Sequence, residues 1–250
     1  MRRAGTLVGG WLFALALMAG FSALGTWQLG RGAQKQAMLA ETAGVLDARR
    51  ARPLAEASDP AARDRHDWAE GRARFVDVAP VLLDNQQRDG RVGVRVFRLA
   101  QAEARDLLLV DMGWLPLPGD RRLPALAPGG RDALAGDFEL RGLLAPPPAA
   151  GLRLGTGIAS SAHVEAGGEP VWLATRIEPA AISQALGTGP VAPRVLRLDP
   201  ALPIGHERDL VLLANTLPPE KHRGYAVQWF GLAIATLLTA LILTFRRSRP

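Results

Sequence analysis

The chain has 250 residues, of which 48% are hydrophobic and 22% charged, a size and composition that fit one domain plus membrane segments. It contains no cysteine, which excludes CxxC redox chemistry, thiolate metal sites and covalent haem attachment. Its net charge of +6 does not indicate a nucleic-acid-binding protein, because residues 31–223 hold 25 basic and 24 acidic side chains and the excess lies at the two ends.

The first element is a long apolar segment. Residues 4–30 are uncharged and as a helix would span about 40 Å, more than the roughly 30 Å core of a bilayer. A cleaved signal peptide is the alternative. The apolar run exceeds the usual 7 to 15 residues of such a peptide, and Trp27 follows the small residues near its end, so we expect a retained transmembrane helix.

Beyond this span, residues 31–51 are rich in helix-forming residues and lack proline, which predicts that the helix continues until Arg52-Pro53. From His66 onward the pattern changes to short apolar or alternating runs separated by turn residues. Such runs predict a mostly antiparallel sheet or small barrel, with one short helix at residues 180–186. The eight expected strands are WAEGRARFV, VLLDNQ, VGVRVFRLA, LLLVDMGWLPL, DFELRGLLA, PVWLATRIE, RVLRLD and LVLLAN.

The expected sheet domain offers no pattern typical of an enzyme. Ser160, Ser161 and His163 lie close in sequence but without a GxSxG nucleophile motif, and an ordinary polar loop explains them. His66, His163 and His206 lack the spacing of zinc ligands. We therefore expect a protein without catalytic activity.

A second uncharged run, residues 224–245, predicts a second transmembrane helix of about 33 Å. Basic residues lie between each span and the nearest chain terminus, so the positive-inside rule places both termini in the cytoplasm. They are Arg2, Arg3, Arg246, Arg247 and Arg249. The expected organisation is an α+β membrane protein of the bacterial inner membrane, with residues 1–30 and 224–250 as anchors and 31–223 as a periplasmic domain.

Small residues recur at four-residue spacing in both spans. They are Ala16 and Gly20 in the first, and Gly231, Ala235 and Thr239 in the second. Because small residues let helices approach closely in lipid, we expect these faces to pack on each other, with docking of another membrane protein as the alternative.

The most informative residues lie at the start of the second span, at its expected periplasmic end. Pro218-Pro219-Glu220 is typical of a helix start. His222 then falls in the first helical turn, where the helix dipole disfavours imidazolium, so we expect a neutral ring able to bind a metal. Tyr225 and Trp229 follow at i+3 and i+7 on the same face, and Lys221 and Arg223 flank the histidine.

The first span presents Trp27, Gln28, Arg31 and Lys35 at the same membrane depth. A neutral histidine between helices, with aromatic rings and cations nearby, suits haem, whose iron takes an axial imidazole and whose propionates take Arg or Lys. An aromatic belt with snorkelling cations is the alternative that any two-span protein would show.

Four short motifs stand in order along the chain. They are Gly25-Thr26-Trp27-Gln28-Leu29-Gly30-Arg31 with Lys35, Asn85-Gln86 with Gly90, Gly113-Trp114-x-Pro116, and His222-x-x-Tyr225-Ala226-x-x-Trp229-Phe230. Together they resemble the surfeit-locus-protein-one (Shy-type) family, whose members assist the assembly of cytochrome c oxidase. The resemblance covers about residues 10–245, with both spans at the expected ends. Glu220, Arg223 and Met112 stand where the family usually has Asn, Leu and Arg.

The resemblance implies an assembly factor that aids insertion of haem a into oxidase subunit one, in contact with membrane lipid and with a haem a synthase as a further candidate partner. It implies that His222 is the axial ligand of the haem iron. The other expected cofactor-binding residues are Arg31, Lys35, Arg223, Trp27, Gln28, Tyr225 and Trp229.

Two other functions stay open at this point. One is a scaffold that steadies a subunit-one assembly intermediate without touching haem. The other is a two-span periplasmic sensor or transporter accessory, against which stands the handful of residues expected inside the cell.

Overall fold

The computed structural model describes residues 2–103, 107–123, 125–126, 134–148, 157–159, 165–166, 169–212 and 217–246, with only the backbone for residues 2–4, 159, 165 and 169. The chain divides into two compact units. Met1–Ala40 and Thr216–Pro250 form a helix unit, and Glu41–Asn215 form a sheet unit.

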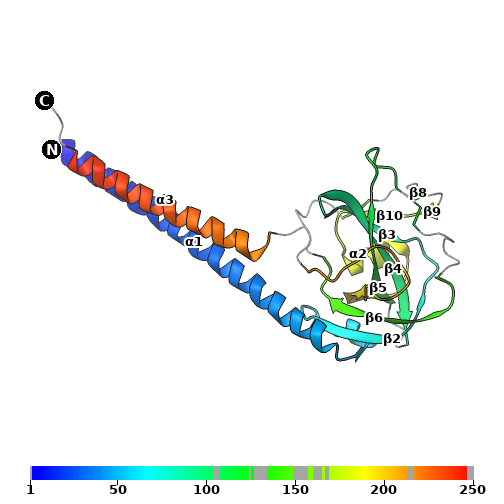
Figure 1. Cartoon of the computed structure of the whole chain (residues 1–250). Coiled ribbons are helices and arrows are strands. Elements are labelled where there is room, and N and C mark those ends of the chain that lie inside the picture. Colours follow the sequence, from blue (N-terminus) through cyan, green and yellow to red (C-terminus); the bar gives the residue numbers. More distant parts are fainter. Residues whose placement is uncertain are drawn as a thin grey trace. The chain divides into compact units, whose positions relative to one another are not determined.

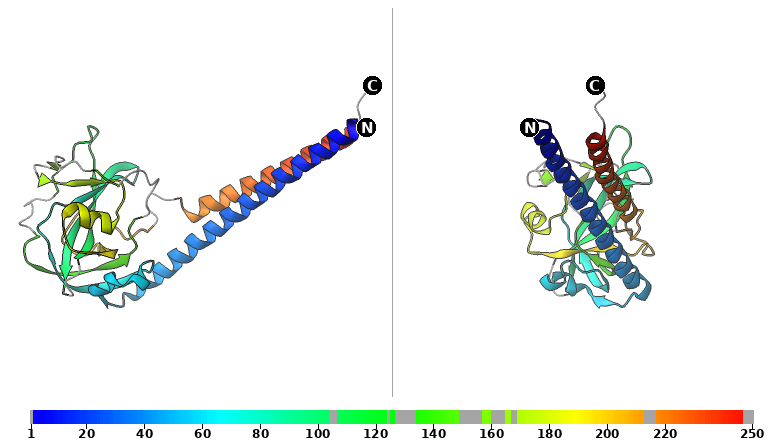
Figure 2. Two further views of the ribbon diagram at one scale, coloured as in Figure 1. Left: turned by 180° about the vertical axis from the view of Figure 1, so that it is seen from behind. Right: turned by 90° about the vertical axis from the view of Figure 1, so that its left-hand side faces the viewer.

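The helix unit consists of two long helices that lie side by side in opposite directions (Figures 1 and 2). They are α1 (Arg2–Ala48), whose last turns from Glu41 belong to the sheet unit, and α3 (Pro219–Phe245). Their most apolar 18-residue windows have mean hydropathy values of 1.9 and 2.0, and only 6% of each window is buried inside the protein. Two such exposed apolar helices are those of a membrane protein, because lipid is the medium that covers them. Helix α1 does continue past the first span, as predicted, and it ends at Ala48.

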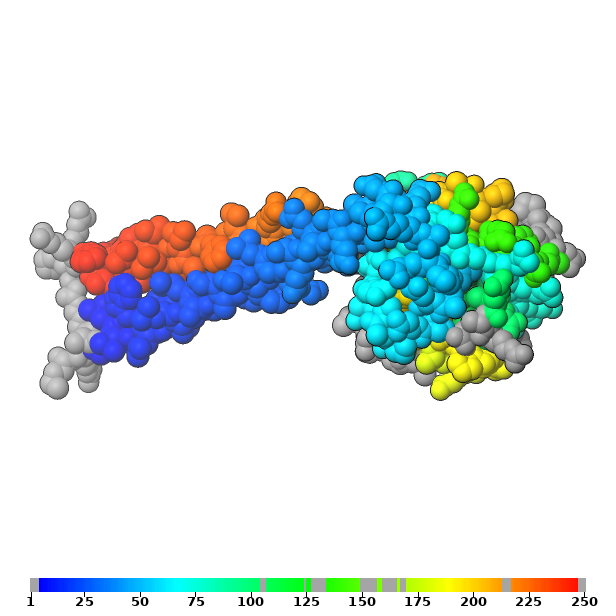
Figure 3. Space-filling model, turned by 90° about the horizontal axis from the view of Figure 1, so that it is seen from below, coloured from blue at the N-terminus to red at the C-terminus, as the bar shows by residue number. Residues whose placement is uncertain are grey.

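The two helices meet along a seam that repeats every three and four residues, the 3.5-residue period of left-handed helix pairs. Figure 3 shows α1 in blue against α3 in orange and red along this seam. On α1 the buried and half-buried positions include Ala14, Met18, Phe21, Gly25, Gln28, Gly32 and Lys35. On α3 they include Pro219, His222, Ala226, Trp229, Ala233, Thr236 and Ala240.

The two spans do pack on each other, as predicted, but not through the small-residue faces. Ala16 and Gly20 on α1 are exposed, as are Gly231, Ala235 and Thr239 on α3. A Cβ atom added at Gly20 or Gly231 would meet nothing within 4 Å. Glycine and alanine are frequent throughout both helices, so a four-residue spacing recurs on several faces and does not by itself select the one that is buried.

The sheet unit contains the expected short strands. Its longer strands are β2 (Asp67–Phe75), β3 (Val81–Arg88), β4 (Arg91–Ala102), β5 (Leu107–Pro116), β6 (Asp137–Ala145) and β11 (Val191–Leu198). The short ones are β1 (Arg52–Pro53), β7 (Ile158–Ala159), β8 (Glu165–Ala166), β9 (Glu169–Pro170) and β10 (Trp172–Ala174). The helices are the 3-10 turns η1 (Leu54–Ser58) and η2 (Pro60–Ala62), and α2 (Pro179–Leu186), which confirms the expected short helix.

Nine strands form one sheet in the order β1-β2-β6-β11-β5-β4-β3-β10-β7, and an extra pairing between β2 and β4 closes five of them into a small barrel. Most pairs are antiparallel, as predicted. Three are parallel, namely β1 with β2, β10 with β3 and β11 with β5, so the sheet is mixed. A parallel pair needs a crossover connection, which a hairpin-based interpretation of the turns does not foresee.

Alternate side chains of the strands build two apolar cores. Leu108, Val110 and Met112 of β5 point into the first core, with Leu140 and Leu196 from neighbouring strands. Leu109 points to the opposite face, where the second core includes Ile182 of α2. The expected strand LVLLAN is wrong for residues 210–212, which are not in a strand, and residues 213–216 lie outside the described chain.

Candidate functional site

The helix unit joins the two predicted motifs of the spans through one polar contact. His222 lies in the first turn of α3, and its Nδ1 is 2.7 Å from Oε1 of Gln28 on α1. Only 7% of His222 is exposed. The sequence predicted that the two residues lie at one membrane depth, and the structure adds a direct hydrogen bond between them, which was not predicted.

Two glycines allow the helices to approach closely on either side of this contact. A Cβ atom on Gly32 would lie 3.4 Å from the Cβ of His222 and from the carbonyl oxygen of Pro219. A Cβ atom on Gly25 would lie 2.8 Å from two ring carbons of Phe230. Gly32 was not among the predicted site residues, although its seven-residue separation from Gly25 matches the period of the seam.

The predicted cations are distributed along the same end of the helix pair. Lys35 donates to the carbonyl oxygen of Leu217, just before α3 begins. Arg223 donates to Oε1 of Gln36 on α1, over 2.6 Å. Arg31 is exposed and donates to Gln34 of its own helix. Lys35 and Arg223 thus link the two helices, whereas Arg31 points its charge outward.

The predicted aromatic residues do not form one wall. Trp229 stacks on Phe21 of α1, with ring centroids 5.8 Å apart. Trp27 is 56% exposed and Tyr225 43% exposed, so both lie outside the seam. Phe21 was not predicted as a site residue, because the cross-helix stacking depends on a register that the sequence does not reveal.

The donor chemistry at His222 fits a haem iron. Its Nε2 is buried and has no hydrogen-bond partner in the described residues. When Nδ1–H donates to Gln28, the lone pair of the neutral ring lies on Nε2, the arrangement found in metal-ligating histidines. The atom is shielded from solvent, so the side chains that cover it would have to turn aside before it could hold an iron. His222 is also the one histidine of the helix unit, which limits the unit to a single imidazole ligand.

The two internal motifs meet inside the sheet unit. Trp114 of β5 is 1% exposed, and its Nε1 donates to the carbonyl oxygen of Gln86 on β3, 3.1 Å away. The intervening strand β4 passes beneath the indole at Gly93, where a Cβ atom would lie 2.4 Å from the ring. Asn85 has a φ of 55° at a bulge of β3, which interrupts the regular pairing with β4 just before Gln86.

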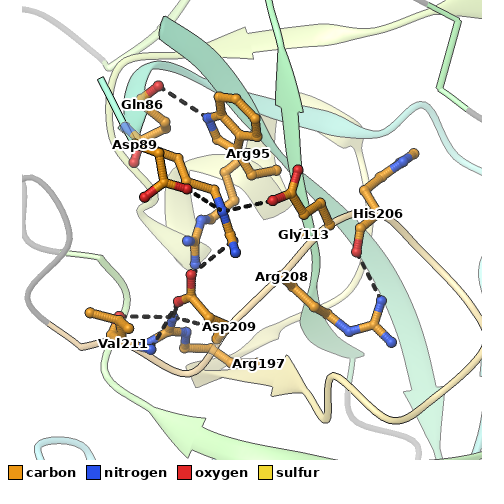
Figure 4. Close-up of polar contacts among 12 residues, drawn as sticks. Gln86, Asp89, Arg95, Gly113, Arg197, His206, Arg208, Asp209 and Val211 are labelled. Carbon is orange, nitrogen blue, oxygen red and sulfur yellow. Dashed lines mark hydrogen bonds and ion pairs between the residues drawn. The ribbon is translucent and has the colours of Figure 1, made fainter. Parts of the chain in front are cut away.

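A loop of residues 199–211 packs beside this cluster, around the guanidinium of Arg208 (Figure 4). Arg208 donates to the carbonyl oxygens of Asp199, Leu202, Ile204 and His206. The loop is joined to β5 by hydrogen bonds from His206 N to Met112 O and from Trp114 N to Glu207 O. The structure of this loop could not be predicted from sequence patterns, because hydrogen bonds to main-chain atoms hold it in place.

His206 has an unusual environment in this loop. Burial, followed by the charges of Arg98 and Arg208, lowers its pKa to about 4. The ring is therefore neutral at physiological pH. At Gly113, where φ is 114°, a Cβ atom would lie 2.8 Å from the carbonyl oxygens of His206 and Glu207. This close approach explains the glycine of the Gly113-Trp114 motif.

The described residues contain no group of three or more metal-ligating side chains, and Ser160, Ser161 and His163 lie outside them. Sequence comparison supplies the family. No curated protein matches the chain. The model of the SURF1 family matches residues 15–234, which include most of α1, the first part of α3 and every described strand of the sheet unit. The chain therefore belongs to the SURF1 family, which is membrane-anchored and associated with the assembly of cytochrome c oxidase.

Proposed function

We propose that the protein carries haem a to subunit one of cytochrome c oxidase as a non-enzymatic assembly factor of the bacterial inner membrane. The observation that carries this proposal is Nε2 of His222, a buried ring nitrogen without a hydrogen-bond partner among the described residues. A buried ring nitrogen without a partner costs free energy, and ligation of a metal would supply the missing partner.

Charge at the same end of the helix pair supports an anionic cargo. In the proposed orientation both termini lie in the cytoplasm and the sheet unit in the periplasm. The periplasmic face of the inner membrane then carries four cations, Arg31, Lys35, Lys221 and Arg223. One acid, Glu220, accompanies them. The positive-inside rule places excess cations on the opposite side, so this cluster has a local purpose. The propionates of haem are suitable partners.

In this proposal the residues around His222 have distinct roles. His222 would ligate the iron, and the outward-facing Arg31 would reach a propionate. Trp27 and Tyr225 are exposed on the helix pair and can turn toward the macrocycle. A single imidazole and a covered Nε2 make a site that releases haem, as transfer to subunit one requires. A haem a synthase is the expected source.

The direct test is co-expression with the enzymes that make haem a, followed by purification of the full chain in mild detergent and analysis of the extracted haem. We expect near-stoichiometric haem a in the wild type and at least a tenfold loss in His222→Ala. His206→Ala is the matched control, because it removes a histidine of the sheet unit, and it should retain the haem. Haem content in His222→Ala equal to the wild type would contradict the proposal.

A scaffold that binds subunit one without haem is the second candidate. It is favoured by Lys35 and Arg223, which already have hydrogen-bond partners within the helix pair. This candidate predicts that Gly25→Leu, which disturbs the contact with Phe230, impairs oxidase assembly more than His222→Ala does. Membership of a family associated with oxidase assembly argues against a sensor or transporter accessory.

A further inference from the structure

We propose that Gln28 is a positioning residue that fixes the tautomer of His222, so that Nδ1 carries the hydrogen and Nε2 presents its lone pair to the iron. This inference rests on the proposed haem-carrier function. It gives Gln28 a role through His222 rather than a contact with haem.

The first step is the hydrogen bond itself. The distance of 2.7 Å between Nδ1 of His222 and Oε1 of Gln28 is short for a nitrogen–oxygen pair. An amide oxygen only accepts, so a neutral imidazole bonded to it must donate from Nδ1. The other ring nitrogen is then unprotonated, and that atom is the one without a partner among the described residues. Both observations at the ring agree with a single tautomer.

The second step is the rigidity of the contact. Gln28 lies on α1 between Gly25 and Gly32, the two positions where a Cβ atom would lie against Phe230 or against the start of α3. The half-buried glutamine is therefore attached to a backbone that is held close to α3. A hydrogen bond in such a shielded seam is stronger than one in water. The ring orientation follows from the packing of the two helices.

The third step is the choice of an amide rather than a carboxylate. A carboxylate partner raises the basicity of a metal-ligating histidine, whereas a neutral amide orients the ring with less effect on its basicity. A carrier has to release its cargo, so a moderate ligand suits it. The variants Gln28→Glu and Gln28→Leu should therefore behave differently. Gln28→Glu should bind haem more tightly and lower the reduction potential of the haem, whereas Gln28→Leu should lose the fixed orientation of the His222 ring.

Nitrogen NMR of the full chain, labelled with ¹⁵N-histidine and held in lipid nanodiscs without haem, tests the tautomer directly. His222→Ala identifies the His222 signals among the four histidines. We expect a protonated Nδ1 and an unprotonated Nε2 in the wild type, and loss of this preference in Gln28→Leu. Gln228→Leu, at an exposed position of α3, is the matched control and should keep the wild-type signals. A protonated Nε2 in the wild type would overturn the inference, as would an unchanged tautomer in Gln28→Leu.

Titration of the same proteins with ferric haem b measures the consequence. We expect Gln28→Leu to weaken binding by about 10- to 100-fold, the usual effect of removing the partner of a ligating histidine. Gln228→Leu should bind as the wild type does. Equal affinity in Gln28→Leu and wild type would overturn the role of Gln28. Absence of haem binding in the wild type, beside the expected tautomer, would instead contradict the carrier function and leave the orientation of His222 by Gln28 intact.

Discussion

Arg194 of β11 donates from Nη1 to Oδ2 of Asp67 on β2, over 2.6 Å, and strand β6 lies between these two strands in the sheet. The Arg194 side chain is 0% exposed, and it also donates to the carbonyl oxygen of Glu56. This ion pair thus joins two strands that do not pair directly, together with the 3-10 turn that precedes β2.

Removing Arg194 should destabilise the sheet unit strongly. Arg194→Met removes the closest partner of Asp67, which keeps Arg52 and Arg65, and it leaves the carbonyl oxygen of Glu56 without this donor, a combined loss of about 3 kcal/mol. Arg74→Met is the matched control, since Arg74 of β2 pairs with Asp137 but is 66% exposed. Such surface pairs contribute about 1 kcal/mol or less. Denaturant unfolding of the two variants in detergent, followed by tryptophan fluorescence, checks the difference, and equal losses would refute it.

Gly93→Ala should disrupt the contact between Trp114 and Gln86. The added Cβ atom would lie 2.2 Å from the carbonyl oxygen of Leu115 and 2.4 Å from the Trp114 ring, and neither group can move without displacing its strand. We expect a loss of about 3 kcal/mol or more, in the range of overpacked buried sites. Gly119→Ala, where the added atom meets nothing within 4 Å, should leave the thermal midpoint nearly unchanged. Similar midpoints for both variants would contradict this account of the cluster.

Gly25→Leu should separate α1 from α3. The larger side chain cannot share the space of the Phe230 ring, so we expect the interhelical distance to grow by about 1 to 2 Å. The chain has no native cysteine, so spin labels can be attached at Leu15→Cys and Leu238→Cys, both exposed, without other changes. Pulsed electron resonance in nanodiscs measures the distance. Gly20→Leu is the control and should leave it unchanged, and a shift in both variants would show that the seam is misplaced.

The stability of the sheet unit should fall in mild acid. Burial lowers the pKa of His206 to about 4 and also lowers that of His66, so the folded state resists protons that the unfolded chain binds below pH 6.5. The unfolding free energy therefore has its full value above pH 6.5 and decreases as the pH falls toward 4. His206 accounts for about 2 kcal/mol of this decrease, once solvent screening of its partly exposed ring is allowed for. Unfolding of His206→Gln at a series of pH values should show a smaller decrease, and a curve identical to the wild type would exclude this role.

Much of the fold could be predicted because periodicity and hydropathy are local. The two spans and most of the strand runs follow from spacing along the chain, whereas the hydrogen bond between Gln28 and His222 does not. The buried seam could not be predicted, because it depends on which glycine meets a ring from the other helix. Likewise, the hydrogen bond from Trp114 to Gln86 lies beside a bulge of β3, and the loop around Arg208 is held by contacts to main-chain atoms. These are long-range relationships that a pattern in one segment does not contain.

The ends of the nine-stranded sheet bear on how other proteins can recognise this unit. Its outermost strands, β1 and β7, have two residues each, and β2 and β4 close the barrel between themselves. A terminal strand that short offers few unpaired main-chain groups to an incoming chain, which protects a protein from edge-to-edge aggregation. Among the described residues, the two ends of this sheet therefore offer a partner protein little main chain to extend.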